Sequence, residues 1–466
     1  MLVNRAFKVR LYPNDKQRKL IDRTFGCARK VYNALLADRK DTYERLRKEC
    51  IQNPNEYQRL QDELSTLYKS TQSGKKPLIK EKWKEIREFE KANLDKAALK
   101  EKLKIAAKSY KTWKQIKDES VNDSGEKYMY AVDSLALSAA SQNLQTAFTN
   151  FYNGIGGRRK GQSGYPKFKS KTGNASYTTY QQQQSFSDII DIGNKTIKIA
   201  KLGKIKFVGN IPDLSGLVMW NKAWSETVSR DAAGHYFVSI LLDFDVVEVA
   251  PKPIDCDSKI IGLDMALEKC YVDSDGNSPD FTGHYRANEK KLKRIGKLLS
   301  HKQGSKKGEE KSRRFKKLQK TIARTQFHIQ KSRREFVELE TNRLIENNDV
   351  IAIENLTMRG MANKKAHHGK SVADVSWGLF TNRLTQKMQN SGKILHKVGR
   401  FFPSSKQCRF CGNKNDNLKL KDRKWKCPHC GAMIENRDHN AALNIKEEAT
   451  RELAGLTCSP VLLKNR

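Results

Sequence analysis

The sequence predicts a multidomain α+β protein, and three observations lead to that prediction. The chain has 466 residues, which is too long for one ordinary hydrophobic core and points to roughly two to four domains of about 150 residues each. Blocks of strand-like and helix-like sequence follow one another along the chain. Near the C-terminus, two CxxC pairs indicate a small module built around a metal ion. We therefore expect a β domain with a helical insert, followed by a strand-containing second half that a zinc ribbon interrupts.

The chain opens with one strand of the β domain. Residues 7–11 alternate apolar and basic side chains, which is typical of a strand with one wet face. Pro13 and Asn14 then favour the start of a helix. Residues 40–150 are rich in Lys, Glu, Leu and Ala and are nearly free of proline, as helical sequences are. We assign residues 13–150 to a helical domain.

Strands return after the helical segment. Residues 154–171 form a connector rich in Gly and Lys, with too few apolar side chains to be buried. A strand-rich stretch follows to about residue 250, and its clearest strand spans residues 235–244. The simplest arrangement joins this stretch to the first strand, so that residues 1–12 and 151–252 form one β domain around the helical insert.

Two acidic residues end apolar, β-branched runs in the second half of the chain. Asp264 follows residues 260–263 and Glu354 follows residues 350–353, and such runs predict strands that are buried on both faces. A third acid, Asp438, stands at the start of a helix-like stretch after the last CxxC pair. A single acid at a strand end is more often a cap or a loop ligand than a catalytic group. Taken together, the three acids could converge on one site.

Three carboxylates suit a pair of Mg²⁺ ions. Hard oxygen ligands can hold two such ions about 4 Å apart, where one activates water and the other stabilises the leaving 3′ oxygen of a phosphodiester. Asp264, Glu354 and Asp438 therefore point to metal-dependent hydrolysis of nucleic acid.

Two cysteine knuckles predict a structural zinc site. Their ligands are Cys408, Cys411, Cys427 and Cys430. Fifteen residues separate the knuckles, a spacing that matches a tetrahedral four-thiolate ribbon with Zn–S distances of about 2.3 Å. Four unmodified core thiols are the alternative, but the proline and the glycines in and just after the knuckles suit tight turns instead. His429 lies inside the second knuckle, and we expect it not to bind the metal because four cysteines already complete the shell.

The charge of the chain indicates its partners. With 90 Lys and Arg against 52 Asp and Glu, the formal net charge is +38, which calls for a polyanion and fits nucleic acid best. A membrane surface is the competing polyanion, but no apolar run approaches the roughly 18 residues that a spanning helix needs, and the basic segments are spread along the chain.

The N-terminus lacks the apolar stretch of a signal peptide, so we expect the protein in a reducing cytoplasm. In that compartment the remaining cysteines should be free thiols. They are Cys27, Cys50, Cys256, Cys270 and Cys458.

The most basic segment lies between the first two acids. Residues 290–334 contain 18 Lys or Arg and, before Glu335, only the acids Glu309 and Glu310. Apolar residues at helical spacing on either side of Gly304 predict two amphipathic helices. A solvated charged face is the usual explanation of such a run. We favour phosphate contact, because charges of one sign would repel one another without a polyanion opposite them.

The order of the motifs carries a family resemblance. GLDMAL at residues 262–267 precedes IAIENL at residues 351–356, and the two knuckles then precede NRDHNAALNI at residues 436–445. In this order the chain resembles the TnpB nucleases of bacterial transposons and the miniature type V CRISPR effectors related to them. The resemblance covers roughly residues 135–447. The first 35 residues agree more loosely, and residues 40–130 match no part of the family that we can place.

The resemblance implies an RNA-guided DNA endonuclease that cleaves double-stranded DNA next to a short flanking motif. It implies a RuvC-like nuclease domain of the RNase H fold at residues 253–400 and 435–447, interrupted at residues 401–434 by a ribbon that binds the target nucleic acid. The β domain would be a barrel-like wedge that holds the guide RNA, and the helical insert a recognition domain. Residues 448–466 would form a tail. The assembly would be a monomeric ribonucleoprotein in which base pairing reads the target sequence.

Site residues follow from the same resemblance. Asp264, Glu354 and Asp438 would bind Mg²⁺, and the four cysteines would bind zinc. The family usually has Asp where this chain has Asn436, a residue that can donate and accept hydrogen bonds but carries no charge. Two other hypotheses stay open: an RNA-guided repressor that binds DNA without cleaving it, and a zinc-ribbon protein that binds nucleic acid without a guide.

The basic connector offers candidate contacts to the guide RNA backbone, with a merely solvated linker as the alternative. Tyr165 and Phe168 could stack on bases or fill the seam between domains. The basic candidates are Arg158, Arg159, Lys160, Lys167, Lys169 and Lys171.

Overall fold

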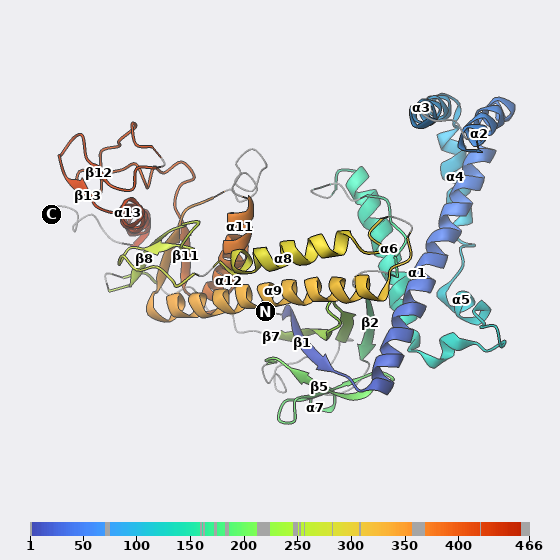
Figure 1. The fold of residues 1–466 in the computed structure, drawn as a ribbon, viewed down its shortest axis with the longest axis horizontal. Coiled ribbons are helices and arrows are strands. Elements are labelled where there is room, and N and C mark those ends of the chain that lie inside the picture. The colour runs from blue at the N-terminus through green and yellow to red at the C-terminus, as the bar shows by residue number, and fades with distance from the viewer. Residues whose placement is uncertain are drawn as a thin grey trace. The chain divides into compact units, whose positions relative to one another are not determined.

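The computed structural model divides the chain into two units, Leu2–Val246 and Val247–Arg466 (Figure 1). The structure describes residues 2–457 apart from residues 70–74, 159–160, 162–163, 172–174, 182–185, 212–223, 246–249, 251–252, 256, 282, 307–308, 357–368 and 420.

The first unit is built on one antiparallel sheet. Its strand order is β2-β6-β7-β1-β5-β4-β3. The strand that opens the chain pairs along its length with β7 on one side and with β5 on the other. The strands are β1 (Leu2–Tyr12), β2 (Ala175–Gln181), β3 (Ile190–Asp191), β4 (Thr196–Ile199), β5 (Gly203–Val208), β6 (Trp224–Arg230) and β7 (Tyr236–Asp245). The predicted return of the chain to its first strand is therefore confirmed. The edge strands β2 and β3 do not pair with each other in the described part of the chain, so a closed barrel is not confirmed.

Two long helices share a core with this sheet. α1 (Asp15–Glu49) begins at Asn14 with a capping box, in which the Asn14 side chain accepts from the backbone of Gln17. The buried side chains of α1 and of α6 (Ser134–Ile155) join those of β1, β5 and β7 in one cluster. The prediction of a separate helical domain at residues 13–150 is therefore wrong at both ends. Both helices present an apolar stripe, and the sheet is what buries it.

The remaining helices of this unit stand partly apart. α2 (Pro54–Lys69) and α3 (Lys75–Asn93) pack on each other around Tyr57, Leu60 and Ile86. α4 (Lys96–Ala106) packs against the far end of α1. The short elements are α5 (Trp113–Glu119), a 3-10 turn at Tyr128–Ala131 and α7 (Phe186–Ile189). Only these separate hydrophobic clusters therefore remain of the predicted helical domain.

The second unit is an α/β assembly. Its sheet has the order β11-β10-β8-β9, in which β8, β10 and β11 run parallel and β9 is antiparallel to β8. The elements are β8 (Ile260–Asp264), β9 (Val272–Asp273), β10 (Val350–Ile353), β11 (Ile394–Lys397), α8 (His284–Ser300), α9 (Arg313–Asn347), α11 (Gly369–Val375), α12 (Trp377–Asn390) and α13 (Arg437–Thr457). All four residues of β10 are buried, as its unbroken apolar run predicted.

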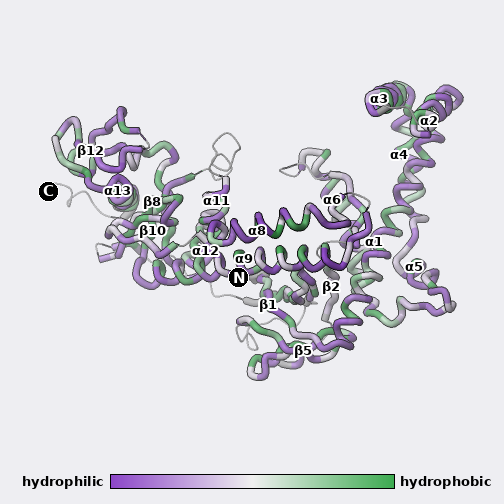
Figure 2. Tube along the Cα trace, viewed as in Figure 1, coloured by the Kyte–Doolittle hydropathy of each residue, from purple (hydrophilic) through white to green (hydrophobic). Residues whose placement is uncertain are grey.

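The basic segment forms two helices, as predicted. α8 and α9 pack on each other, and α8 is largely hydrophilic along its length (Figure 2). In the described part of residues 290–334, three basic side chains form ion pairs: Lys293 with Glu289, Lys331 with Glu335 and Arg333 with Asp374. Most of the positive charge therefore has no protein partner in the described structure.

The C-terminal helix is longer than expected. α13 continues to Thr457, so the prediction of a tail from residue 448 is wrong as far as residue 457. Ile445, Ala449 and Leu453 are all buried, and their spacing keeps one apolar stripe on the helix beyond the motif. Residues 458–466 lie outside the described residues. Among the described residues, no helix is long and apolar enough to cross a membrane.

Candidate functional site

Asp264 and Glu354 stand at the carboxyl ends of two neighbouring strands. β8 and β10 pair in parallel with Leu263 opposite Ile353. Asp264 is the last residue of β8, and Glu354 directly follows β10. Both acids therefore leave the sheet at the same edge, which is where parallel sheets place their ligands. The expectation that both acids end buried strands is confirmed.

Asp438 approaches from α13, which lies directly on β8. At the closest approach, a Cβ added to Gly262 would lie 2.2 Å from the backbone oxygen of Ala442 and 2.7 Å from the backbone nitrogen of Lys446. A side chain here would push the helix away from the strand, so glycine sets the depth at which α13 packs. Asp438 lies in the first turn of that helix, and its position depends on this contact.

Asn436 caps the turn that carries Asp438. Its side-chain oxygen accepts hydrogen bonds from the backbone nitrogens of Asp438, at 3.0 Å, and of His439, at 3.3 Å. Asn and Asp cap helices about equally well. An Asn in place of an Asp at this position therefore preserves the start of α13, because capping requires a side-chain oxygen but no charge.

The acids influence one another electrostatically. Burial raises the pKa of Asp264 well above its ordinary value, and the nearby charges of Glu354 and Asp438 raise it further. Burial also raises the pKa of Glu354, while a hydrogen bond donated by the Ser404 hydroxyl opposes that shift. A bound cation would therefore stabilise the ionised form of Asp264 in this buried, acidic surrounding.

Two arginines supply positive charge to Asp438. Nη1 of Arg423 donates to both carboxylate oxygens, at 2.9 Å each, and Nη2 of Arg437 donates to Oδ1 at 3.1 Å. Among the described residues, the group compact enough to hold a metal as it stands is the cysteine cluster, and the three carboxylates do not form a second one. The carboxylate oxygens of the three acids therefore do not meet in one group here, and their joint role stays a prediction.

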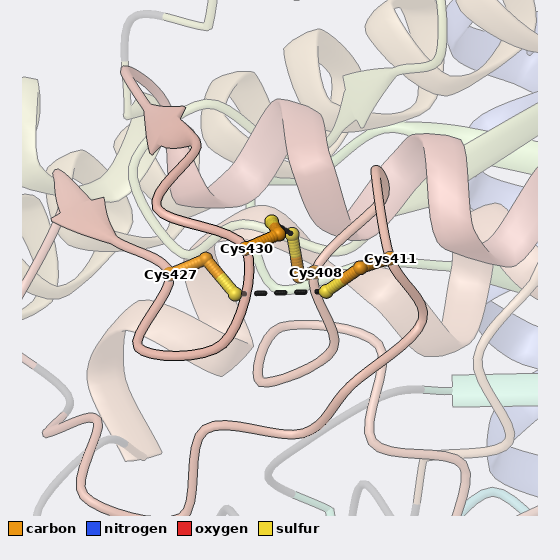
Figure 3. Close-up of side chains that lie close together, drawn as sticks. All are labelled: Cys408, Cys411, Cys427 and Cys430. Atoms are coloured by element: carbon orange, nitrogen blue, oxygen red, sulfur yellow. Dashed lines mark hydrogen bonds between the residues drawn. The ribbon is translucent and has the colours of Figure 1, made fainter.

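The four predicted zinc ligands do come together. The sulfur atoms of Cys408, Cys411, Cys427 and Cys430 all lie within 4.8 Å of one another, and His429 is not in the group (Figure 3). The pairs Cys408–Cys430 and Cys411–Cys427 are each separated by 3.7 Å. Four sulfurs at about 2.3 Å from one zinc ion would be about 3.8 Å apart at the corners of a tetrahedron. The cluster could therefore bind zinc.

The two knuckles have the same backbone geometry. Gly412 donates to the oxygen of Cys408 at 2.8 Å, and Gly431 donates to that of Cys427 at 3.0 Å. Both glycines have positive φ, 71° and 72°, which other residues rarely adopt. The second knuckle forms the loop of a short hairpin, in which β12 (Trp425–Lys426) pairs with β13 (Met433–Ile434).

Two asparagines of α13 attach the ribbon, and the sequence reasoning missed them. Asn444 donates to the backbone oxygens of Ser404 and Gln407, at 2.7 Å each. Asn440 donates to Gln407 at 2.8 Å and accepts from Arg409 at 3.1 Å. The available signal was their spacing of four residues on one face of an otherwise apolar helical stretch. Ser404 thus joins Glu354, the ribbon and α13.

The basic connector lies beside a groove in the first unit. The backbone of Lys169 exchanges hydrogen bonds with the Asn33 side chain, and its ammonium lies 4.3 Å from the centroid of the Tyr32 ring. Phe168 lines a groove of about 690 Å³ together with Arg29, Lys30 and other residues of α1. Arg158, Lys167 and Lys171 are exposed. Arg159 and Lys160 lie outside the described residues.

Three family profiles match parts of the chain. Residues 1–49 match a helix-turn-helix domain, residues 246–365 a probable transposase, and residues 377–445 a Cas12f1-like, TNB domain. In the structure, the first of these segments forms β1 and the single helix α1. The second contains Asp264 and Glu354, and the third contains the four cysteines and Asp438.

Curated relatives match most of the chain. A protein of Streptomyces pristinaespiralis is 28% identical over 448 residues, which are 95% of this chain and 89% of the relative. InsQ of Escherichia coli K12 is 25% identical and covers 66% of this chain and 73% of its own length. Both are named as RNA-guided DNA endonucleases. A cryo-EM structure of a Cas12f1-sgRNA-target DNA complex aligns with a TM-score of 0.42 at 14% identity, over 96% of this chain and 99% of that one.

Proposed function

Since the chain belongs to the TnpB family of transposon-encoded nucleases, we propose that it is an RNA-guided DNA endonuclease. It would cleave double-stranded DNA next to a short flanking motif. The observation that carries the proposal is the meeting of Asp264 and Glu354 at the ends of adjacent parallel strands, with α13 and Asp438 packed against the same sheet.

We assign the three acids to a Mg²⁺ site. The donor set fits, because hard carboxylate oxygens are the ligands that Mg²⁺ prefers. When bound, a pair of Mg²⁺ ions would activate water and stabilise the leaving oxygen of the phosphodiester. The chain itself positions the ligands: β8 and β10 fix two of them, and the packing of α13 at Gly262 fixes the third.

The ribbon is assigned a supporting role. Zinc on the four cysteines would hold both knuckles, and Asn440 and Asn444 would keep them against α13. The ribbon begins beside Glu354 and ends beside Asp438. A nucleic acid strand held by it would lie next to the acids, so we propose that the ribbon loads the target strand.

Guide RNA is the proposed partner of the basic surfaces. In the first unit these are the connector and the groove along α1, and in the second they are the exposed faces of α8 and α9. The net charge of +38 supports an RNA partner, because phosphate contacts release counterions and favour binding. Base pairing would then read the target, and the protein would read shape and the flanking motif. The proposed assembly is a monomeric ribonucleoprotein.

A guided binder without cleavage is the second candidate. The arginines that occupy Asp438 favour it, because an acid held in this way is not free to bind a metal ion. The same hydrogen bonds are also compatible with an active enzyme if the arginines can be displaced.

One experiment separates these functions. The protein is purified from cells that carry its native flanking DNA, the RNA that co-purifies through high salt is sequenced, and a matching plasmid is offered with Mg²⁺. Asp264→Asn removes one ligand, and Asp257→Asn, an exposed acid preceding β8, is the matched control. A discrete RNA with cutting that only Asp264→Asn abolishes supports the endonuclease. Discrete RNA without cutting indicates a repressor, and no discrete RNA indicates an unguided zinc-ribbon protein.

A further inference from the structure

The Arg423 guanidinium group contacts the Asp438 carboxylate as a chelated cation would. A single nitrogen, Nη1, lies 2.9 Å from both Oδ1 and Oδ2. Arg423 belongs to the ribbon, in the stretch between the two knuckles, whereas Asp438 belongs to α13. A side chain of the ribbon therefore lies where a metal ion bound to Asp438 would lie.

The two arginines on Asp438 differ in exposure. The Arg437 side chain is 11% exposed and lies on the same helix, next to Asp438 in the sequence. The Arg423 side chain is 59% exposed, so it could turn into solvent without leaving a buried void. Its backbone would stay in place, because the Arg423 carbonyl accepts a hydrogen bond from the Arg437 nitrogen at 2.9 Å. Only the guanidinium group would need to move.

Phosphate is the natural alternative partner for this group. A guanidinium binds carboxylate and phosphate with the same planar geometry. Exposed ion pairs are weak and are screened by salt, so a nucleic acid strand and a divalent cation arriving together could replace the pair. The exchange would leave each acidic group with a positive partner, since the cation pairs with Asp438 while Arg423 pairs with the phosphate.

We propose that Arg423 is an exchangeable partner of Asp438: it holds the third acid while no target strand is bound, and it transfers to a phosphate of the strand that the ribbon delivers. Asp438 then keeps the Arg437 hydrogen bond at Oδ1, and its Oδ2 becomes available to the metal ion. This inference rests on the proposed nuclease function. Metal binding at the acid site would then depend on the presence of the target strand. The residue responsible, Arg423, lies outside the sequence motifs that identified the site.

If Arg423 exchanges in this way, its replacement should strengthen metal binding and weaken cleavage. Arg423→Gln removes the competitor, so Mn²⁺ should bind the guide-loaded protein about tenfold more tightly when no target is present. The same variant lacks the phosphate contact, so single-turnover cleavage should fall about tenfold or more. Lys424→Gln is the matched control: it removes the same charge from the next residue, whose side chain is 70% exposed and pairs with Glu435 rather than Asp438.

Mn²⁺ affinity is measured by electron paramagnetic resonance on the RNA complex, and zinc content confirms that the ribbon is intact. If Arg423→Gln loses zinc, Arg423→Met, which keeps a long unbranched side chain but removes the charge, replaces it and should change both readouts in the same directions. Equal Mn²⁺ affinity in the Arg423 and Lys424 variants would overturn the exchange, and so would tighter Mn²⁺ binding with unimpaired cleavage. A wild-type complex that neither binds Mn²⁺ nor cuts would refute the nuclease function itself, which is a distinguishable result.

Discussion

The two candidate metal centres of the second unit differ in how far the fold alone assembles them. The four cysteine sulfurs already lie within 4.8 Å of one another. The three acids reach one edge of the sheet, but Asp438 is held by Arg423 and Arg437, and Glu354 accepts a hydrogen bond from Ser404. The four sulfurs of the ribbon are therefore already in place for a metal ion, whereas two of the three acids are hydrogen-bonded to other side chains.

Charge explains the difference. Thiols are neutral when protonated, so four of them can be close without repulsion, and the backbone turns at Gly412 and Gly431 fix their direction. Carboxylates near one another repel when ionised, and burial adds to the cost, as the raised pKa of Asp264 indicates. The ribbon geometry should therefore survive changes at the acid site, while the acid site should depend on the ribbon and on its own packing.

The largest expected effect is on the ribbon itself. Cys427→Ser removes one thiolate, and because the binding free energy of structural zinc is about 10–16 kcal/mol in small peptides, the ribbon should lose its fold. We expect zinc content to fall below one ion per chain and hydrogen exchange to accelerate across residues 408–434. Exchange in β10 should stay slow, since all four of its residues are buried in the sheet.

His429→Ala is the control for that prediction. His429 lies in the same knuckle but outside the sulfur cluster, so zinc content should not change. Loss of zinc in this variant would contradict the assignment of four cysteine ligands.

The second prediction disrupts the acid site and spares the ribbon. Gly262→Ala places a Cβ 2.2 Å from the Ala442 oxygen, so α13 must shift, at about 1–3 kcal/mol of stability. A displacement of about 1 Å can lower a rate by about 10²-fold, and Asp438 moves with the helix. Plasmid cleavage should fall by about that factor while zinc content stays at one ion per chain.

Gly296→Ala is the matched control, because nothing lies within 4 Å of the added Cβ and alanine favours a helix. Thermal unfolding should show unchanged or slightly higher stability. A Gly262→Ala protein that cuts at the wild-type rate would mean that the contact between β8 and α13 does not set the position of Asp438.

The sequence predicted what local patterns encode. An apolar run ending in an acid indicates a buried strand, and this identified Asp264 and Glu354 without tertiary information. Cysteine spacing identified the ribbon in the same way, since the two knuckles are short-range structures. The return of the chain to β1 was also predicted, because one β domain begun by the first strand and completed after the helical insert was the simplest arrangement.

Contacts between distant segments could not be predicted in this way. Gly262 is an ordinary strand residue until α13 packs on it, and Arg423 is one basic residue among many until the ribbon folds back on Asp438. The helical insert was assigned too widely because the apolar stripes of α1 and α6 do not reveal whether helices or a sheet will bury them. Each of these features depends on which surfaces of the folded chain contact one another, and a short stretch of sequence does not contain that information.

The third prediction tests the attachment between the two centres. Asn444 is 2% exposed and donates to Ser404 and Gln407. Asn444→Ala leaves the buried Ser404 carbonyl without this donor, at about 1–3 kcal/mol, while the Gln407 carbonyl keeps its hydrogen bond from Asn440. We expect faster hydrogen exchange at residues 404–409 and unchanged zinc content, because the knuckles keep their own hydrogen bonds. Asn417→Ala, at an exposed position of the ribbon, should change neither. Loss of zinc in the Asn444 variant would show that the ribbon fold depends on its docking.

The smallest expected effect concerns Ser404, which contacts Glu354 of the acid site and Asn444 of α13. Its hydroxyl donates to Glu354, and its carbonyl accepts from Asn444. Ser404→Ala removes only the first bond, and a hydrogen bond to a charged group contributes about 1.5–3 kcal/mol, part of which a metal ion on Glu354 would replace. Single-turnover cleavage should therefore slow by less than about tenfold, with Ser405→Ala as the neighbouring control. A larger loss would mean that Ser404 still orients Glu354 when the metal is bound, and the acid site would then depend on the ribbon through this hydroxyl as well as through Arg423.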